Sequence, residues 1–499
     1  MRLQRWCTIG PFTKINLPFG EVRSMYTRRQ ILRAIAFSPM VGLIPAYASA
    51  PAEKFSSQRP PLSQRKFTSR AVEKVIVEVK ARIADPELAW MFENCYPNTL
   101  DTTVQMGSVN GKPDAFILTG DIEAMWLRDS SCQVWSYLPF AMQDQDLQQL
   151  YCGLIARQAR CILLDPYANA FCFDSKAKPL SWAVDDMTEM RPGVAERKWE
   201  IDSLCYCIRL AHGYWRQTAD VSPFGAEWAR AMRLVVTTFR EQQRLQGPGS
   251  YHFQRRTETP SDTQALGGYG NPARPVGLIY SMFRPSDDAC LYSLLVPSNL
   301  FATVSLRQLA EMATHILNDS ALASECSAFA SEIEVALARY GRIQDARGEV
   351  WAYEVDGFGN QLFMDDANIP GLYGLPYLGC CALNDPLYLR TRARAWSSTN
   401  PYFIRGSAGE GIGSPHVDLN TVWPLSFITR AITSTDDEEI WQCLRWIKAT
   451  HAGTGFIHES FNKDNPVQFT RPWFGWANSY FGELIVKLSR ERPDVLKRT

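Results

Sequence analysis

Residues 147–162, LQQLYCGLIARQARCI, carry the pattern that decides the fold class. A spacing of apolar side chains near 3.6 residues indicates an amphipathic helix with one buried face. The apolar positions of this segment follow that spacing: Leu147, Leu150, Tyr151, Leu154, Ile155, Ala159 and Ile162. The segment therefore predicts a helix of about four turns.

The same periodicity recurs along the chain. It is clear at residues 72–83 and 322–340. Further helices are expected near residues 200–216, 225–244, 298–316, 377–395, 434–450 and 477–490. No comparable series of alternating strands appears. Between the helices lie segments rich in glycine, proline and aromatic residues: 97–130, 182–202, 247–290, 351–376, 402–426 and 452–479. This alternation predicts an all-α helical toroid with its functional loops gathered at one end.

Composition narrows the function. The 499 residues are 46% apolar and 21% charged, which is ordinary for a soluble globular protein and excludes a mainly disordered or collagen-like chain. Lys plus Arg and Asp plus Glu each number 52, so the formal charge is zero. A dedicated nucleic-acid binder is expected to carry a basic excess, so no nucleic-acid partner is expected. The 15 tryptophans suit a sugar-binding cleft, although most would equally fit a core.

The N-terminal residues 1–50 resemble a twin-arginine export signal. Arg28 and Arg29 precede a weakly apolar run, and the small-residue site Ala48-Ser49-Ala50 predicts cleavage after Ala50. The internal position of the arginine pair favours Met25 as the true translation start. The run is too short to span a membrane, so we expect no membrane insertion after cleavage and a periplasmic or extracellular location.

The rest of the chain is expected to form one domain. Residues 51–67 are rich in proline, serine and glutamine and predict a linker. Residues 68–495 contain neither a fixed-period repeat nor a low-complexity tract, so we do not divide them. The cysteines show no C-x-x-C pair and no zinc spacing, so neither a disulfide framework nor a metal site is expected.

Residues 120–130, GDIEAMWLRDS, combine carboxylates with Trp126 and Arg128. Arg128 and Asp129 are able to fix neighbouring sugar hydroxyls beside a tryptophan platform. An ion pair between Arg128 and Asp129 at a helix start is an equally good interpretation.

Residues 284–289, RPSDDA, place two carboxyls side by side. Neighbouring carboxyls oppose each other's ionisation, so Asp287 or Asp288 is a candidate general acid that keeps its proton near neutral pH. The alternative is that Ser286 or Asp287 caps a helix.

Residues 455–461, GFIHESF, place His458 and Glu459 in an aromatic setting, followed by TRPWFGWAN at residues 470–478. Glu459 is a candidate general base, and its alternative role is a buried ion pair with Arg471. No second histidine follows at the spacing of a zinc-protease helix, which argues against a metal site.

Four further loops are rich in acids: residues 185–187, 200–203, 364–368 and 409–416. Singly they would serve as caps or turns, but together they suit recognition of a polyhydroxylated neutral ligand. The glycine loop at residues 409–413 lacks a following G-K-[ST], which argues against phosphate binding. A G-x-S-x-G elbow is also absent, which argues against an acyl hydrolase.

Seven segments of the chain resemble glycoside hydrolase family 125, the bacterial and fungal exo-acting α-1,6-mannosidases. They occur in the family's order and together cover about residues 68–490. The segments are residues 94–103, 120–130, 200–206, 283–290 with 296–299, 364–370, 406–415 and 458–478. The resemblance implies an (α/α)6 barrel that removes terminal α-1,6-linked mannose from an oligosaccharide or glycan. It also implies inversion of configuration and no metal or other cofactor.

Carried over by motif, the resemblance implies that the general acid lies within residues 284–289 and that Glu459 is the base. Asp287 is narrowly favoured over Asp288 as the acid. Inversion requires the two carboxyls to lie roughly 6.5–9.5 Å apart, which leaves room for the attacking water. The residues expected to hold the mannose are Trp126, Arg128, Asp129, Asp202, Arg284, Asp365, Asp366, His458 and Trp473.

Two alternatives remain open. One is another inverting glycosidase, or a sugar epimerase, on the same barrel. Epimerases of this shape use histidine as acid and base, and only His416 and His458 lie in the functional loops. The other is an inactive exported carbohydrate-binding protein, which has little need for two opposed carboxylates.

Overall fold

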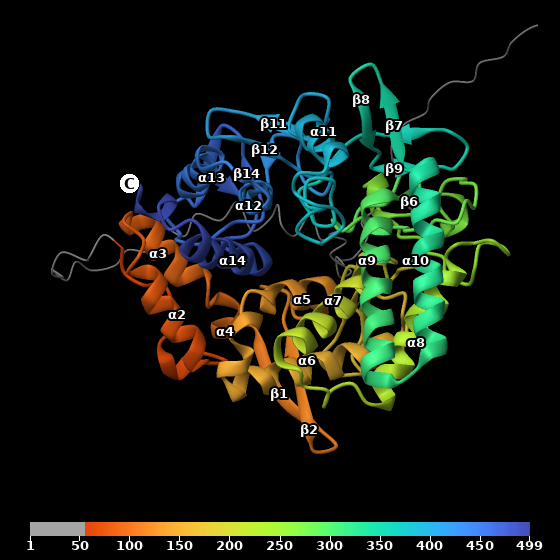
Figure 1. Cartoon of the computed structure of the whole chain (residues 1–499), viewed down its shortest axis with the longest axis horizontal. Helices are drawn as coiled ribbons and strands as arrows, with labels where there is room; N and C mark the ends of the chain where they lie inside the picture. The colour runs from red at the N-terminus through yellow and green to blue at the C-terminus, as the bar shows by residue number, and fades with distance from the viewer. Residues whose placement is uncertain (1–54) are drawn as a thin grey trace, which may run out of the picture.

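The computed structural model describes residues 55–499 (Figure 1). The expected export signal, residues 1–50, lies outside the described residues. The described part of the expected linker is attached to the domain: Trp90 Nε1 donates to the carbonyl oxygen of Ser56 at 2.6 Å. Arg59 in addition forms ion pairs with Glu73 and, at 2.8 Å, with Asp101. From residue 55 onward, this segment therefore belongs to the domain surface.

Helices account for most of the described architecture. The α-helices are α2 (Arg70–Lys80), α3 (Pro86–Cys95), α4 (Asn98–Thr102), α5 (Leu127–Trp135), α6 (Gln145–Leu164), α7 (Ile201–Thr218), α8 (Ala226–Glu241), α9 (Val296–Met312), α10 (Ser320–Tyr340), α11 (Pro386–Ala395), α12 (Pro424–Ile432), α13 (Asp437–Thr450) and α14 (Gly475–Glu491). Short 3-10 turns occur at Leu62–Gln64, Leu138–Gln143, Pro260–Asp262, Leu266–Gly268 and Val495–Lys497, and a π-turn, Ala313–Leu317, continues α9.

Helix α6 confirms the prediction made for residues 147–162. Every apolar side chain on its predicted face is buried. The Asp144 side chain caps its N-terminus by accepting hydrogen bonds from the backbone N–H groups of Asp146 and Leu147, at 2.9 and 3.3 Å. The helix expected over residues 377–395 is shorter than predicted: residues 377–385 form turns, and α11 begins only at Pro386, capped by Asp385.

The chain alternates between an inner and an outer layer of helices, which confirms the predicted helical toroid. In the inner layer α5 packs on α7, α7 on α9, α12 on α14, and α14 returns to α5. In the outer layer α6 packs on α8, and α10 and α13 cover α9 and α12; Figure 1 shows α9 and α10 side by side. The turns before α11 take an inner position, because Tyr377 contacts Arg209 of α7 and Tyr480 of α14.

Short antiparallel strands occupy the loops, so the sheets are small. They are β1 (Val104–Val109), β2 (Lys112–Ile117), β3 (Met125–Trp126), β4 (Ala170–Phe171), β5 (Val194–Glu196), β6 (Leu294–Leu295), β7 (Arg342–Asp345), β8 (Gly348–Trp351), β9 (Glu354–Val355), β10 (Gln361–Leu362), β11 (Phe403–Arg405), β12 (Glu410–Ile412), β13 (Thr421–Val422), β14 (Phe461–Asn462) and β15 (Asn465–Phe469). They form the sheets β1-β2, β3-β4-β5, β6-β9-β10, β7-β8, β11-β12 and β13-β14-β15.

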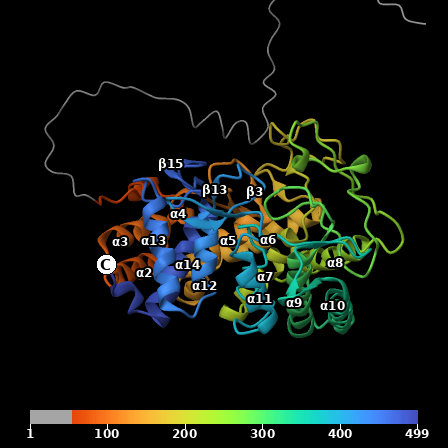
Figure 2. The same ribbon diagram turned by 90° about the horizontal axis from the view of Figure 1, so that it is seen from above.

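Several strands end where an inner helix begins. Strand β3 leads directly into α5, β6 into α9, and β13 reaches α12 after one residue. Figure 2 shows β3, β13 and β15 on one side of the helices. The strands therefore fix the N-terminal ends of inner helices at one end of the toroid. No helix in the described part of the chain is long and apolar enough to cross a membrane.

Candidate active site

The candidate site lies at the N-terminal ends of four inner helices. Trp126, Glu200, Trp423 and Phe474 are the residues that immediately precede α5, α7, α12 and α14. Each has an extended backbone, which turns the chain from a loop into the helix. Residues far apart in the sequence thus meet at one end of the toroid.

A pocket opens at this end of the toroid. Five of the residues predicted from the sequence line it: Trp126, Arg128, Asp129, Asp287 and Glu459. The remaining lining residues are Pro285, Ser286, Asn368, His416, Trp423, Phe474 and Trp476. The candidate acid and the candidate base therefore face one cavity.

Arg128 binds carboxylates from three segments. Its Nη1 donates to Glu200 Oε2 at 2.7 Å and to Asp202 Oδ2 at 3.1 Å, and its Nη2 donates to Asp287 Oδ1 at 3.3 Å. The predicted pair with Asp129 is also present, with 3.6 Å between Nε and Oδ2. Burial raises the pKa of Asp202 to about 6, against the opposing charge of Arg128. Arg128 thus gathers the acids of the pocket.

Asp287 adopts a strained backbone conformation, with φ of 65°. Its N–H donates to the carbonyl oxygen of Arg284 at 2.8 Å, and its own carbonyl accepts from Lys198 Nζ at 2.7 Å. The alternative role as a helix cap is not found, because α9 begins only at Val296. Such strain persists where the surroundings over-determine the conformation, as they do here, and it is common at functional sites.

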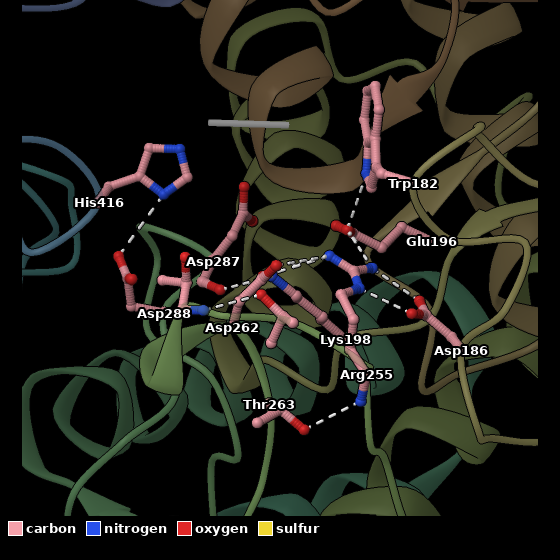
Figure 3. A network of polar contacts seen from close by, with 12 residues as sticks. Trp182, Asp186, Glu196, Lys198, Arg255, Asp262, Thr263, Asp287, Asp288 and His416 are labelled. Atoms are coloured by element: carbon pink, nitrogen blue, oxygen red, sulfur yellow. Dashed lines mark hydrogen bonds and ion pairs between the residues drawn. The ribbon is translucent and has the colours of Figure 1, made fainter. Parts of the chain in front are cut away.

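A buried network of charges supports Asp287 from behind (Figure 3). Lys198 Nζ also donates to Asp262 Oδ1 at 2.6 Å. Arg255 joins Asp262 to Asp186 and Glu196, with N–O distances of 3.2, 2.6 and 3.0 Å. Two cations and three carboxylates therefore fix the loops on which the candidate acid rests.

Asp288 points to a different partner. Its Oδ2 lies 3.5 Å from His416 Nδ1, as Figure 3 shows, and it is not among the residues that line the pocket. The two adjacent carboxyls are thus separated by geometry, and Asp287 is the one that faces the cavity.

The carboxylate of Glu459 is held by Arg471. Arg471 Nε donates to Glu459 Oε1 at 3.2 Å, and Arg471 also forms an ion pair with Asp121. Among the described residues, Glu459 Oε2 has no hydrogen-bond partner. Arg471 has a positive φ of 61°, as Asp287 does. The predicted ion pair between Glu459 and Arg471 therefore coexists with a place in the pocket.

The family model described as metal-independent alpha-mannosidase (GH125) matches residues 85–486. The chain belongs to this family of glycoside hydrolases. Its barrel is the (α/α)6 barrel expected from the resemblance.

Two relatives cover most of this GH125 enzyme. The meiotically up-regulated gene 157 protein of Schizosaccharomyces pombe (strain 972 / ATCC 24843) is 40% identical over 459 residues, which are 88% of this chain and 90% of that protein. A solved structure from a family of metal-independent alpha mannosidases, a Streptococcus pneumoniae non-productive complex with alpha-1,6-mannobiose, is 37% identical with a TM-score of 0.82. It matches 86% of this chain and 100% of that chain.

A bacterial glucoamylase complexed with acarbose shares the fold alone, at 12% identity and a TM-score of 0.51. The match covers 82% of this chain and 57% of that chain.

Among the residues expected to hold mannose, Asp365 and Asp366 do not line this pocket and accept hydrogen bonds from loop residues. Asp365 accepts the N–H groups of Leu372 and Tyr373 at 2.7 and 2.9 Å, and its burial raises its pKa to about 7. Asp366 accepts the side-chain amide of Asn368 at 2.9 Å and so orients a residue of the pocket.

The remaining expected sugar contacts are also absent from the pocket lining. Arg284 pairs with Glu354 at 2.6 Å, and Trp473 is half-buried beside Gly120. Asp202 does not line the pocket, but it forms an ion pair with Arg128, which does. Asp202 is therefore placed to act on the pocket through Arg128, whereas a sugar contact by Arg284 or Trp473 stays a prediction.

His458 is likewise a supporting residue. Its ring nitrogens lie 2.9 Å from the carbonyl oxygen of Arg471 and 3.1 Å from that of His451. Its ring stacks on Phe469 with 3.8 Å between centroids, and burial lowers its pKa. His458 therefore fixes the backbone of the residue that holds Glu459.

Sequence reasoning missed an aromatic wall of the mannosidase pocket. Trp423 contacts Phe474 edge to face at 6.0 Å, and Phe474 contacts Trp476 at 6.3 Å. In the described part of the chain Trp423 Nε1 has no hydrogen-bond partner, so it is able to donate to a ligand hydroxyl. The sequence does contain a pattern that marks this wall. An aromatic residue directly precedes the proline or glycine at which an apolar helix begins, as in Trp423-Pro424.

The described residues contain no group of three or more His, Cys, Asp or Glu side chains that could hold a metal ion.

Proposed function

We propose that this mannosidase is an exo-acting enzyme that removes terminal, non-reducing α-1,6-linked mannose with inversion. The observation that carries the proposal is one pocket with Asp287 and Glu459 in its wall. The solved relative in complex with alpha-1,6-mannobiose supports the linkage.

In the proposed reaction Asp287 donates its proton to the glycosidic oxygen as the bond from this oxygen to C1 breaks. Glu459 accepts a proton from a water molecule that attacks C1 from the opposite face. The products are β-mannose and the shortened glycan, and the proton balance closes when Glu459 releases its proton and Asp287 regains one from solvent. Inversion places the two carboxyls roughly 6.5–9.5 Å apart.

The residues that line the pocket have different proposed roles in binding the sugar. The rings of Trp126, Trp423 and Trp476 present flat apolar faces to the sugar, and Arg128 with Asp129 offers a donor and an acceptor to its hydroxyls. Asn368 and His416 supply further polar groups in the pocket lining. Few but directed polar groups on an apolar wall are the usual composition of a specific small-ligand site.

The deciding experiment is NMR-followed hydrolysis of α-1,6-mannobiose in EDTA, recording which mannose anomer appears before mutarotation. Initial β-mannose is the expected result. Initial α-mannose would overturn inversion and require a nucleophile in place of a base. If the α-1,6, α-1,2 and α-1,3 isomers are all inert, the substrate is a different sugar or the protein only binds glycans.

We also propose export through the twin-arginine-like segment around Arg28 and Arg29, with a periplasmic or extracellular mature enzyme beginning after Ala50. N-terminal sequencing of the protein from the exported fraction tests this. A mature start upstream of Arg28, or enzyme confined to the cytoplasm, contradicts it.

A further inference from the structure

Glu200 has no assigned role in the reaction, yet it lies directly beside the candidate acid. The Glu200 and Asp287 carboxyls share one guanidinium, because both accept from Arg128, at 2.7 and 3.3 Å. Ser203 Oγ donates to Glu200 Oε2 at 2.9 Å. Two buried carboxyls held on the same guanidinium oppose each other's ionisation, so a proton on one of them is favoured.

The surrounding charges make this proton necessary. The Glu200 side chain is fully buried, and those of Arg128 and Asp287 are 3% and 7% exposed. The one guanidinium of Arg128 faces Asp129, Glu200, Asp202 and Asp287, so full ionisation would leave a buried excess of negative charge.

In the described part of the chain, the two further cations of this network are already paired with other carboxylates. Lys198, the other cation against Asp287, contacts its backbone carbonyl and is paired with Asp262. Asn169 Nδ2, 3.4 Å from Asp287 Oδ1, brings no charge. Beyond Lys198, Arg255 is engaged with Asp186, Glu196 and Asp262. Burial raises the pKa of Glu200 well above its usual range, and the charge of Asp287 raises it further against that of Arg128.

We propose that Glu200 and Asp287 share one proton, so that Glu200 is a positioning residue that keeps the acid Asp287 protonated at neutral pH. The inference rests on the proposed function of Asp287. In the reactive form Glu200 is ionised on Arg128, and Asp287 carries the proton that passes to the glycosidic oxygen. After cleavage both carboxyls are ionised until the pair takes up one proton from solvent, which completes the cycle.

Glu200→Gln tests the pairing because the amide keeps the shape and cannot ionise, whereas Glu200→Asp keeps an ionisable carboxyl. In Glu200→Gln the acid faces Arg128 without a competing carboxylate, so its pKa falls. In the pH profile of kcat/KM for α-1,6-mannobiose, the alkaline limb is expected to shift to lower pH by about one unit or more. At pH values above the shifted limb, kcat/KM is expected to be about tenfold lower than that of wild type. Glu200→Asp is expected to restore the limb at least in part.

An activated aryl α-mannoside separates proton donation from geometry. Its leaving group departs without a proton, so Glu200→Gln is expected to hydrolyse it within about threefold of wild type, a smaller loss than general-acid catalysis supplies. Equal losses on both substrates, with an unmoved alkaline limb, would overturn proton sharing and leave Glu200 a purely structural residue.

A second readout does not depend on activity. A carboxyl whose folded-state pKa is raised contributes stability that is present below its unfolded pKa and lost as pH rises through the folded pKa. As pH rises from about 5 to 8, the melting temperature of Glu200→Gln is therefore expected to rise relative to that of wild type. Parallel curves refute proton sharing. Wild type inactive on every mannoside refutes the proposed function instead, and the melting comparison still decides whether the proton is shared.

Discussion

Replacing Glu459 by glutamine isolates the chemistry of the proposed base. The substitution keeps the size of the side chain and an oxygen that accepts from Arg471 Nε, now 3.2 Å from Glu459 Oε1. It removes the ability of the side chain to take a proton from water. The pocket wall is otherwise unchanged, so binding of mannose, and hence KM, is expected to change little.

The size of the effect follows from the role. A positioned general base contributes about 10²- to 10⁴-fold to the rate. That range corresponds to about 2.7–5.4 kcal/mol in the activation barrier. Stability is expected to fall by less, about 1–1.5 kcal/mol, because the retained hydrogen bond from Arg471 loses the charge of its acceptor. Arg471 retains its ion pair with Asp121, so its charge is not left alone.

The assay is kcat and KM on both α-1,6-mannobiose and an activated aryl α-mannoside, with a melting curve to establish folding. Loss of a base slows both substrates, because water attack is needed whatever the leaving group, whereas loss of the acid spares the activated one. Azide added to Glu459→Ala is expected to yield β-mannosyl azide, since this anion needs no base. A folded Glu459→Gln enzyme within tenfold of wild-type kcat would remove Glu459 from the base role.

Four further outcomes are expected. Asp287→Asn should slow hydrolysis of α-1,6-mannobiose by about 10²-fold or more and spare the aryl mannoside, as steady-state kinetics will reveal. Asp288→Asn should chiefly raise KM, because Asp288 orients His416 rather than facing the pocket; a larger kcat loss than Asp287→Asn would reverse the assignment of the acid. Lys198→Met should lower the urea-unfolding free energy by about 3 kcal/mol, by removing a buried cation; a neutral result would contradict the supporting role of the charge network. Trp423→Phe should raise KM about fivefold for the loss of one hydrogen bond, measured on mannobiose; an unchanged KM would mean that Nε1 does not bind substrate.

The helices were predictable wherever one face packs on a large core. Helix α6 follows its apolar positions throughout, because burial of that face is what stabilises it. Residues 377–385 contain apolar side chains at helical spacing but form turns instead. Gly379 takes a φ of 78° there, and Asp385 with Pro386 sets a later helix start. The glycine turn and the later helix start therefore prevent the longer helix that the apolar spacing predicts for these residues.

The site was harder to predict because acids that bind a ligand and acids that bind a loop look alike in a sequence. Asp365 and Asp287 each sit in a loop beside a second aspartate. Asp365 accepts backbone N–H groups and closes a turn, whereas Asp287 faces a cavity. Only the packing of distant segments separates these roles. The aromatic wall escaped prediction for the same reason, since core tryptophans outnumber those of the pocket.

The ends of the inner helices bear on where the proposed shared proton lies. A helix N-terminus carries about half a positive charge, which favours ionised carboxylates within the first turn. Glu200 and Asp202 stand at the start of α7, and Asp129 lies in the first turn of α5. Asp287 lies in a strained loop, outside any described helix. The helix end therefore offsets part of the burial that raises the pKa of Glu200, which favours the proposed reactive form, with Glu200 ionised and the proton on Asp287.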